Sequence, residues 1–299
     1  MRILVSGASG FLGSALSPAL RKAGHNVRAL ERAETHQNGI RWDVESGAPD
    51  GDALREWGGA EAVVHLAGEN VGKRWTAETK ARIRSSRVEA TERLAHSLVK
   101  AGTVRVFVGA SAIGYYGDRG DEVLTESSAN GTGFFAETVK AWELAASPLS
   151  EAGVRVAHLR FGMILGNGGA LRKMLPFFRL GVGGPLGGGR QWVSWIARRD
   201  AVRAIEFLLG NENATGALNA VAPNPVRNCE FSKALGKALH RPAVIPVPAF
   251  VLRLLYGEMA EATVLTSQRV LPERLEESGF AFAQPRVEEA LRESLREQA

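Results

Sequence analysis

A glycine-rich turn at the start of the chain limits what this sequence can fold into. Glycine occupies positions 7, 10 and 13, directly after the β-prone run Arg2–Val5 and at the start of the helix-period segment Gly13–Ala23. In a strand–turn–helix unit, these glycines permit a tight turn, a close approach of pyrophosphate and close helix–strand packing. The helix start then offers N–H groups and a positive dipole end to phosphates. The predicted dinucleotide site comprises Gly7, Ser9, Gly10, Phe11, Leu12 and Gly13.

The first 160 residues alternate between short apolar runs and segments with helical periodicity. The runs are Arg2–Val5, Asn26–Leu30, Ala62–Leu66, Val104–Val108 and Arg155–Leu159, and the helical segments include Gly13–Ala23, Glu78–Lys100 and Phe135–Ala152. Apolar strands that are each followed by a helix predict a parallel sheet covered on both faces. We therefore expect an α/β fold with a Rossmann-type doubly wound sheet.

The pattern changes after about residue 161. Glycines cluster over 181–189, and the stretch 241–248 contains three prolines, which is typical of an extended connector. We expect residues 1–160 to form a dinucleotide-binding domain to which later segments return. Residues 161–299 are then a smaller C-terminal substrate lobe that includes a distinct tail, 246–295.

Composition narrows the classes of partner. The single cysteine, Cys229, excludes an intramolecular disulfide and favours a reducing compartment, so we expect a cytoplasmic protein. No uncharged run reaches the roughly 18–20 residues that a membrane span needs. The 37 Lys and Arg residues exceed the 32 Asp and Glu by five, but they are scattered, and no nucleic-acid-binding motif occurs. The six histidines lack ligand spacing, so no metal site is expected.

One further segment looks superficially like a phosphate-binding loop. Gly68–Arg74 reads GENVGKR, which is one residue short of the Walker spacing and lacks the Ser or Thr that holds magnesium. We do not interpret it as a phosphate loop.

Several motifs together resemble a known family. The spacing of Gly7, Gly10 and Gly13 resembles the extended short-chain dehydrogenase/reductase superfamily. The stretches 65–70 (HLAGEN), 111–117 (SAIGYYG), 184–187 (GPLG), 191–196 (QWVSWI) and the tail containing 267–272 (SQRVLP) are similar to its "epimerase family" branch with a C-terminal domain of unknown function. The resemblance covers essentially the whole chain and implies a Rossmann domain that binds NADP(H).

The resemblance also assigns residues around the cofactor. Arg32 matches an arginine expected to pair with the 2′-phosphate of NADP, whereas Glu31 stands where an acid would accept the ribose hydroxyls of NAD. NADP(H) is therefore predicted, with NAD(H) left open by Glu31. Asp43 fits a position that meets the adenine, and Arg87 fits a phosphate contact or a surface arginine. The segment His65, Leu66, Ala67 and Gly68 is expected to pass beside the cofactor, although His65 fits a packed core residue equally well.

The catalytic pattern of this superfamily is incomplete here. Members use a Ser or Thr with a Tyr-x-x-x-Lys pair, in which tyrosine is the acid or base and lysine lowers its pKa. Ser111 matches the first role and is also expected to contact the cofactor. Lys140 matches the lysine, but Ala136 stands four residues before it. Tyr115 and Tyr116 lie near Ser111, so either could replace the missing phenol or simply pack beside the nicotinamide.

Two functions remain open at this point. The first is an NADP(H)-dependent oxidoreductase or epimerase-like enzyme that acts on an unidentified small substrate, with a nucleotide sugar as one candidate. The alternative is a catalytically silent NADP(H)-binding sensor or scaffold. The segments Glu78–Lys100 and Thr132–Ala152 match helices through which relatives pair, so a homodimer is a further expectation.

Overall fold

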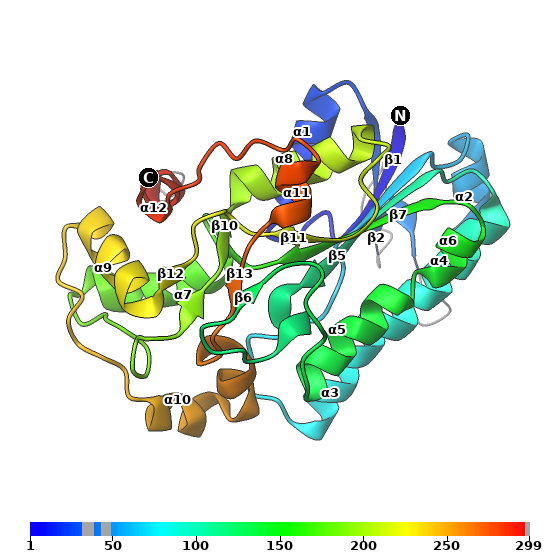
Figure 1. Ribbon diagram of the computed structural model, residues 1–299. Helices are drawn as coiled ribbons and strands as arrows, with labels where there is room; N and C mark the ends of the chain where they lie inside the picture. The colour runs from blue at the N-terminus through cyan, green and yellow to red at the C-terminus, as the bar shows by residue number, and fades with distance from the viewer. Residues whose placement is uncertain (32–38, 43–48, 297–299) are drawn as a thin grey trace.

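A parallel sheet forms the centre of the molecule (Figure 1). The computed structural model describes residues 1–31, 39–42 and 49–296. Within them, seven strands lie in the order β11-β7-β5-β4-β1-β2-β3, and each neighbouring pair is parallel. Their bounds are β1 Arg2–Ser6, β2 Asn26–Glu31, β3 Ile40–Arg41, β4 Ala62–His65, β5 Val106–Ala112, β7 Arg155–Phe161 and β11 Gly216–Ala220. The predicted doubly wound α/β fold is confirmed.

Alternating side chains of the strands pack against helices on both faces of the sheet. On β1, Ile3 and Val5 point to one face and Leu4 to the other, as the two-residue period of a strand requires. The first face is covered by α1 (Gly13–Lys22), α8 (Arg198–Gly210) and α11 (Glu273–Glu277). The second is covered by α2 (Gly51–Glu56), α4 (Ala90–Ala101) and α6 (Ser147–Glu151).

The segment predicted as one helix over 78–100 has three consecutive parts. An α-helix, α3 (Ala77–Arg84), passes into a π-helical turn, Ser85–Glu89, and continues as α4. Thr76 caps the start, with its hydroxyl accepting the N–H of Thr79 at 3.1 Å. Such π-turns are often found at functional sites. The helical pattern over 78–100 did not distinguish this turn from α-helix, and none of the five residues of the turn is buried.

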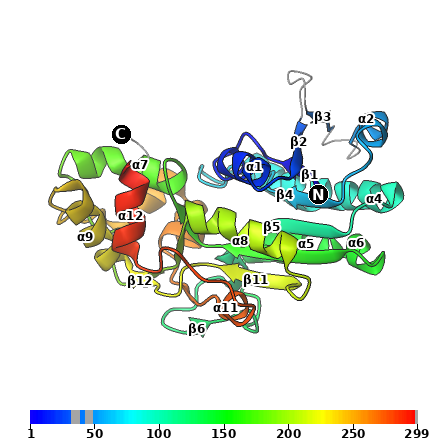
Figure 2. The same cartoon turned by 90° about the horizontal axis from the view of Figure 1, so that it is seen from above.

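The C-terminal part of the chain builds a second core beside the sheet. Its remaining elements are β8 Met163–Leu165, α7 Gly169–Arg179, β9 Trp192–Val193, β10 Trp195–Ala197, β12 Val226–Arg227, α9 Asn228–Leu239, α10 Ala249–Tyr256, β13 Arg269–Val270 and α12 Val287–Arg296. Trp195, Phe231 and Leu291 are fully buried at its centre. Figure 2 shows α7, α9 and α12 gathered at one end of the molecule. Because α8 and β11 pack in the sheet region, the chain crosses between the two cores more than once.

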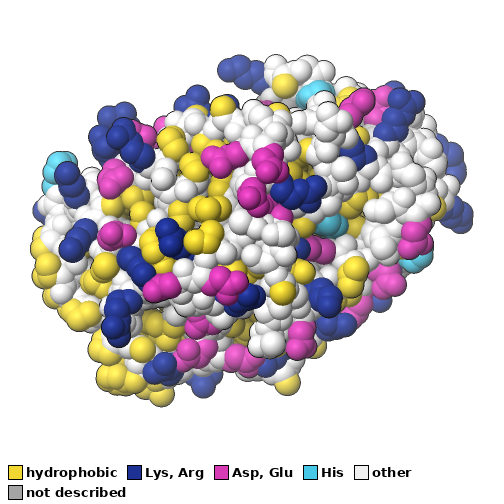
Figure 3. Space-filling view, viewed as in Figure 1, with side chains coloured by type: hydrophobic (Ala, Val, Ile, Leu, Met, Phe, Trp, Pro, Cys, Tyr) yellow, Lys and Arg dark blue, Asp and Glu magenta, His cyan; other side chains and the backbone are white. Residues whose placement is uncertain are grey.

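The surface over α10 is markedly apolar. Phe250, Leu254 and Leu255 of this helix are exposed, and Figure 3 shows hydrophobic side chains gathered over this part of the molecule. None of the helices in the described ranges is long and apolar enough to cross a membrane.

Two histidines lie inside the sheet rather than on its surface. His65 ends β4 and His158 lies on β7, and both side chains are buried. Burial lowers the pKa of each imidazole from 6.5 to about 4, because the charged form loses its hydration. Both histidines are therefore neutral in the folded protein at neutral pH.

This burial predicts a specific loss of stability in mild acid. The pKa of each imidazole is lower in the folded than in the unfolded chain, so unfolding takes up protons between about pH 6.5 and pH 4. Stability is complete above this range and falls as the pH is lowered, by about 1.4 kcal/mol per pH unit for each histidine.

Urea unfolding at a series of pH values measures this slope. His65→Gln and His158→Gln should each lower the slope of the unfolding free energy against pH by the contribution of about one proton. His96→Gln, at an exposed position, should leave this slope unchanged. An unchanged slope in both buried variants would contradict the assignment.

Candidate functional site

The glycine-rich turn joins β1 to α1 at the carboxyl edge of the sheet. Gly7 has φ +68°, and a Cβ there would lie 2.9 Å from the carbonyl carbon of Leu66. A Cβ on Gly13 would lie 2.2 Å from the carbonyl oxygen of Gly7. Gly10 closes the turn by donating its N–H to Gly7 O at 3.0 Å. The first and third glycines are thus required by close backbone contact.

The turn leaves hydrogen-bond donors open at the start of α1. In the described chain, the N–H groups of Phe11 and Leu12 have no acceptor. No side chain caps α1, and its first turn contains no acidic residue. Ser9 is exposed beside these groups. Free N–H groups at a helix start, with the positive end of the helix dipole, form a seat for an anion.

A buried network supports the turn from behind. The hydroxyl oxygen of Ser6 accepts the N–H groups of Leu66 (3.1 Å) and Ala67 (3.2 Å), so its hydrogen is directed to Nδ1 of His65 at 2.7 Å. Nε2 of His65 then donates to Thr91 Oγ1 at 3.0 Å. Both ring nitrogens of His65 are therefore occupied. Its side chain lies in the core and holds β1 and β4 in register.

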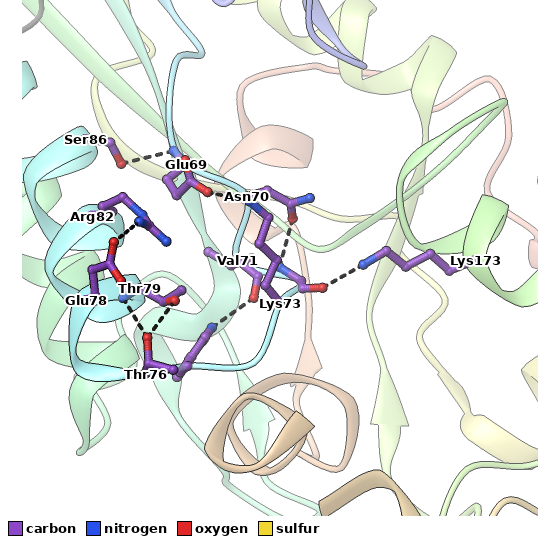
Figure 4. Close-up of polar contacts among 12 residues, drawn as sticks. Glu69, Asn70, Val71, Lys73, Thr76, Glu78, Thr79, Arg82, Ser86 and Lys173 are labelled. Atoms are coloured by element: carbon purple, nitrogen blue, oxygen red, sulfur yellow. Dashed lines mark hydrogen bonds and ion pairs between the residues drawn. The ribbon is translucent and has the colours of Figure 1, made fainter. Parts of the chain in front are cut away.

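The Gly68–Arg74 segment crosses from β4 to α3 as an irregular loop (Figure 4). Asn70 Oδ1 accepts the N–H of Gly72 at 2.8 Å, and Lys73 forms an ion pair with Glu69 at 2.9 Å. Lys173, on α7, donates to Gly72 O at 2.7 Å. The loop thus connects the sheet domain to the C-terminal part, and its lysine is engaged in an ion pair.

Arg87 lies against the same loop, on the π-helical turn. A Cβ on Gly68 would lie 3.2 Å from the Arg87 guanidinium carbon, so the guanidinium packs tightly against this glycine. Burial lowers the pKa of Arg87 to about 10, and the nearby Glu69 carboxylate partly opposes this effect. Nε of Arg87 is buried and has no hydrogen-bond partner among the described residues. An unsatisfied buried donor of this kind fits a bound anion.

The residues predicted to choose between cofactors are only partly described. Glu31 ends β2, and Gly39 passes so close that a Cβ there would lie 2.8 Å from Glu31 Oε2. Arg32 and Asp43 lie outside the described residues.

Ser111 belongs to a buried polar network at the end of β5. Its hydroxyl donates to Glu143 Oε1 at 2.6 Å. Glu143, on α5 (Phe134–Leu144), is held by Arg160 through two parallel hydrogen bonds of 2.7 Å. Burial opposes the charge of Arg160, but the carboxylate outweighs this and raises the arginine's pKa. Because Ser111 donates its only hydrogen to Glu143, its remaining lone pairs can accept a hydrogen bond from a ligand.

The structure gives the two tyrosines different surroundings. Tyr116 is fully buried; its hydroxyl donates to Asn219 Oδ1 at 2.7 Å and accepts from Arg160 at 3.0 Å. Burial raises the pKa of Tyr116 to about 12. Tyr115 is only half-buried, and its ring face lies 3.5 Å from the guanidinium carbon of Arg160. In the described chain, the Tyr115 hydroxyl has no hydrogen-bond partner.

Lys140 lies on α5, on the helix face that also carries Ala136 and Glu143. Residues four and three positions apart share a helix face, but no hydrogen bond or ion pair in the described chain joins Lys140 to the Ser111 network. The side chain of Lys140 is exposed, whereas Ala136 is buried.

Sequence reasoning missed Glu143, Arg160 and Asn219. Arg160 and Asn219 are polar residues at interior positions of apolar strands, and this signal was available in the sequence. Nothing in the sequence around Glu143 indicated a role in the site, because its hydrogen-bond partners Ser111 and Arg160 are distant in the chain.

Comparison with known proteins establishes the class. Residues 3–220 match the NAD dependent epimerase/dehydratase family, and residues 247–294 match a domain of unknown function (DUF1731). The chain belongs to this epimerase family, within the extended short-chain dehydrogenase/reductase superfamily.

Individual relatives resemble it over nearly their whole length. Epimerase family protein Mb2239 of Mycobacterium bovis is 41% identical over 97% of this chain and 96% of its own. The structure of human epimerase family protein SDR39U1 (isoform2) with NADPH superposes with a TM-score of 0.90 at 34% identity, covering 99% of both chains. MoeE5 in complex with UDP-glucuronic acid and NAD has a TM-score of 0.77 at 25% identity, covering 100% of both chains.

Proposed function

We propose that this protein is an NADP(H)-dependent oxidoreductase or epimerase-like enzyme that acts on the hydroxyl or carbonyl group of a small substrate. The observation that carries the proposal is the open glycine-rich turn, with unpaired N–H groups at Phe11 and Leu12. β1, β4 and β5 end at Ser6, His65 and Ala112, so the turn, the loop and the Ser111 network share the carboxyl edge of the sheet. Open α/β sheets bind ligands at this edge.

The residues fit a dinucleotide at this edge. Gly7, Gly10, Gly13 and the open N–H groups would hold its pyrophosphate, and the unpartnered Nε of Arg87 offers a further contact to phosphate. NADP(H), when bound, would supply or accept a hydride. Arg32 supports the phosphorylated form, and the human relative's structure with NADPH agrees with this choice.

The geometry divides the catalytic roles. Ser111, fixed by Glu143, would orient a substrate hydroxyl by accepting its hydrogen bond, and would bind a substrate carbonyl by turning its own hydrogen from Glu143 to that oxygen. Tyr115, whose hydroxyl is free in the described chain, would transfer the proton, and Lys140 would lie on the facing helix. Tyr116 is engaged with Arg160 and Asn219, so we assign it to positioning Arg160 beneath Tyr115. A nucleotide sugar is the proposed substrate class, since MoeE5 is described in complex with UDP-glucuronic acid.

A second candidate, a silent NADP(H)-binding sensor, is favoured by one observation. Ala136 replaces the superfamily's tyrosine, and it is buried against the fold with no polar group to offer. This alternative predicts nucleotide binding without turnover.

Cofactor choice gives the first test. An arginine–phosphate contact is worth roughly 1.5–3 kcal/mol, so Arg32→Ala should reduce the preference for NADPH over NADH by about tenfold or more. Glu31→Ser should increase that preference, because it removes a negative charge near the phosphate. Dissociation constants from fluorescence titration measure both effects, and an unchanged ratio in Arg32→Ala would refute its assignment.

Turnover gives the second test, on a panel of nucleotide sugars and simple carbonyl compounds with NADPH. Tyr115→Phe should lower kcat roughly 10²–10⁴-fold, the usual range for general acid–base catalysis, with NADPH affinity and Tm unchanged. Tyr116→Phe is the matched comparison: it should lower the stability by about 1–3 kcal/mol, because Arg160 and Asn219 lose a buried partner.

The outcomes separate the two functions. If Tyr115→Phe keeps the full rate, the phenol is a packing group and the catalytic assignment is wrong. If no substrate on the panel turns over while NADPH binds, the sensor replaces the enzyme as the better account.

A further inference from the structure

Arg198 lies over the glycine-rich turn, although it is 185 positions away in the chain from Gly13. It is the first residue of α8, and its Nη2 donates to the hydroxyl of Ser14, in the first turn of α1, at 3.0 Å. Its guanidinium carbon lies 4.9 Å from the centre of the Phe11 ring. Phe11 is also one of the two residues whose N–H groups are open. A cation is therefore placed beside the predicted phosphate seat.

The charge of Arg198 is not neutralised within the described chain. No carboxylate there forms an ion pair with it, and its Nε is buried without a hydrogen-bond partner. The neighbouring arginines differ, since Arg199 pairs with Glu293 at 3.5 Å and Arg203 pairs with Asp200 at 2.8 Å. Leaving a buried guanidinium N–H without a partner costs free energy, so the arrangement favours a ligand that supplies an acceptor.

The helix dipole strengthens this argument. The start of α1 carries a partial positive charge, and a second positive group near it is unfavourable in the absence of an anion. An anion bound between the two would instead be stabilised by both. The first turn of α1 provides no acidic side chain for this purpose.

The surrounding backbone is shaped to hold Phe11 and Arg198 together. A Cβ on Gly166 would lie 2.9 Å from the Arg198 side chain, and one on Gly168 would lie 2.5 Å from the Phe11 ring. These glycines follow β8 and allow the loop to pack directly on both side chains. The arginine is thus held in place over the turn by a closely packed wall.

We propose that Arg198 is a pyrophosphate-binding residue of the dinucleotide site, contributed by the segment after the Rossmann core. The inference rests on the proposed function, because it needs a dinucleotide at the turn. The pyrophosphate is the anion that seats on the N–H groups of Phe11 and Leu12, and it is common to NADPH and NADH. Arg198 therefore contributes affinity for both cofactors without choosing between them.

The test is equilibrium binding of NADPH and NADH to the full chain, measured by fluorescence titration. Arg198→Ala should weaken both by a similar factor, roughly tenfold or more, as expected for loss of a charge-assisted contact. Arg199→Ala is the matched control, because it removes the next positive charge on the same helix but one that is exposed and paired with Glu293. Arg198→Lys keeps the charge without the planar fork and should recover part of the affinity.

The outcomes distinguish the inference from the proposed function. Equal affinities in Arg198→Ala and Arg199→Ala would overturn it, and a lower Tm of Arg198→Ala without loss of affinity would show a purely structural contact with Phe11. A change in the ratio of NADPH to NADH affinity would overturn the pyrophosphate assignment. If the wild-type chain binds neither cofactor, the proposed function itself fails and this inference fails with it.

Discussion

The close contact between the glycine-rich turn and the end of β4 is the constraint on which the site depends. Gly7 packs its backbone against Leu66 with no room for a side chain, and the Ser6 hydroxyl accepts the N–H groups of Leu66 and Ala67, just beyond β4. The neutral imidazole of His65 continues this contact to Thr91 on α4. Because the turn is fixed from behind, the N–H groups of Phe11 and Leu12 remain directed outward and unpaired.

A second buried network surrounds Ser111 at the end of β5. Hydrogen bonds of 2.6–3.0 Å join Ser111, Glu143, Arg160 and Tyr116. The guanidinium of Arg160 also stacks on the ring of Tyr115. The bidentate Glu143–Arg160 pair is a rigid geometry that holds both neighbours in place. With Ala136 in the family's tyrosine position, we propose that this network orients the substrate oxygen.

Local features of the sequence predicted the fold well because periodicity reports directly on strands and helices. The runs at Asn26–Leu30 and Arg155–Leu159 became β2 and β7 with small changes at their ends. Contacts between residues that are distant in the chain could not be predicted: the pairing of Glu143 with Arg160 and the placement of Arg198 over Phe11. The π-helical turn around Arg87 is local, but the helical pattern of 78–100 did not distinguish it from α-helix. For His65 the sequence left two interpretations, and only its neighbours Ser6 and Thr91 show that it belongs to the core.

The central claim is that the open turn binds a dinucleotide, and calorimetric titration of Gly10→Ala with NADPH tests it most directly. A Cβ at Gly10 would lie 3.1 Å from Gly7 O, so a small backbone adjustment accommodates it, but the methyl group projects where pyrophosphate must approach. The account predicts that wild-type protein binds NADPH and that Gly10→Ala keeps its Tm within a few degrees while losing most of that affinity. Undiminished binding by Gly10→Ala, or no binding by the wild-type protein, would contradict it.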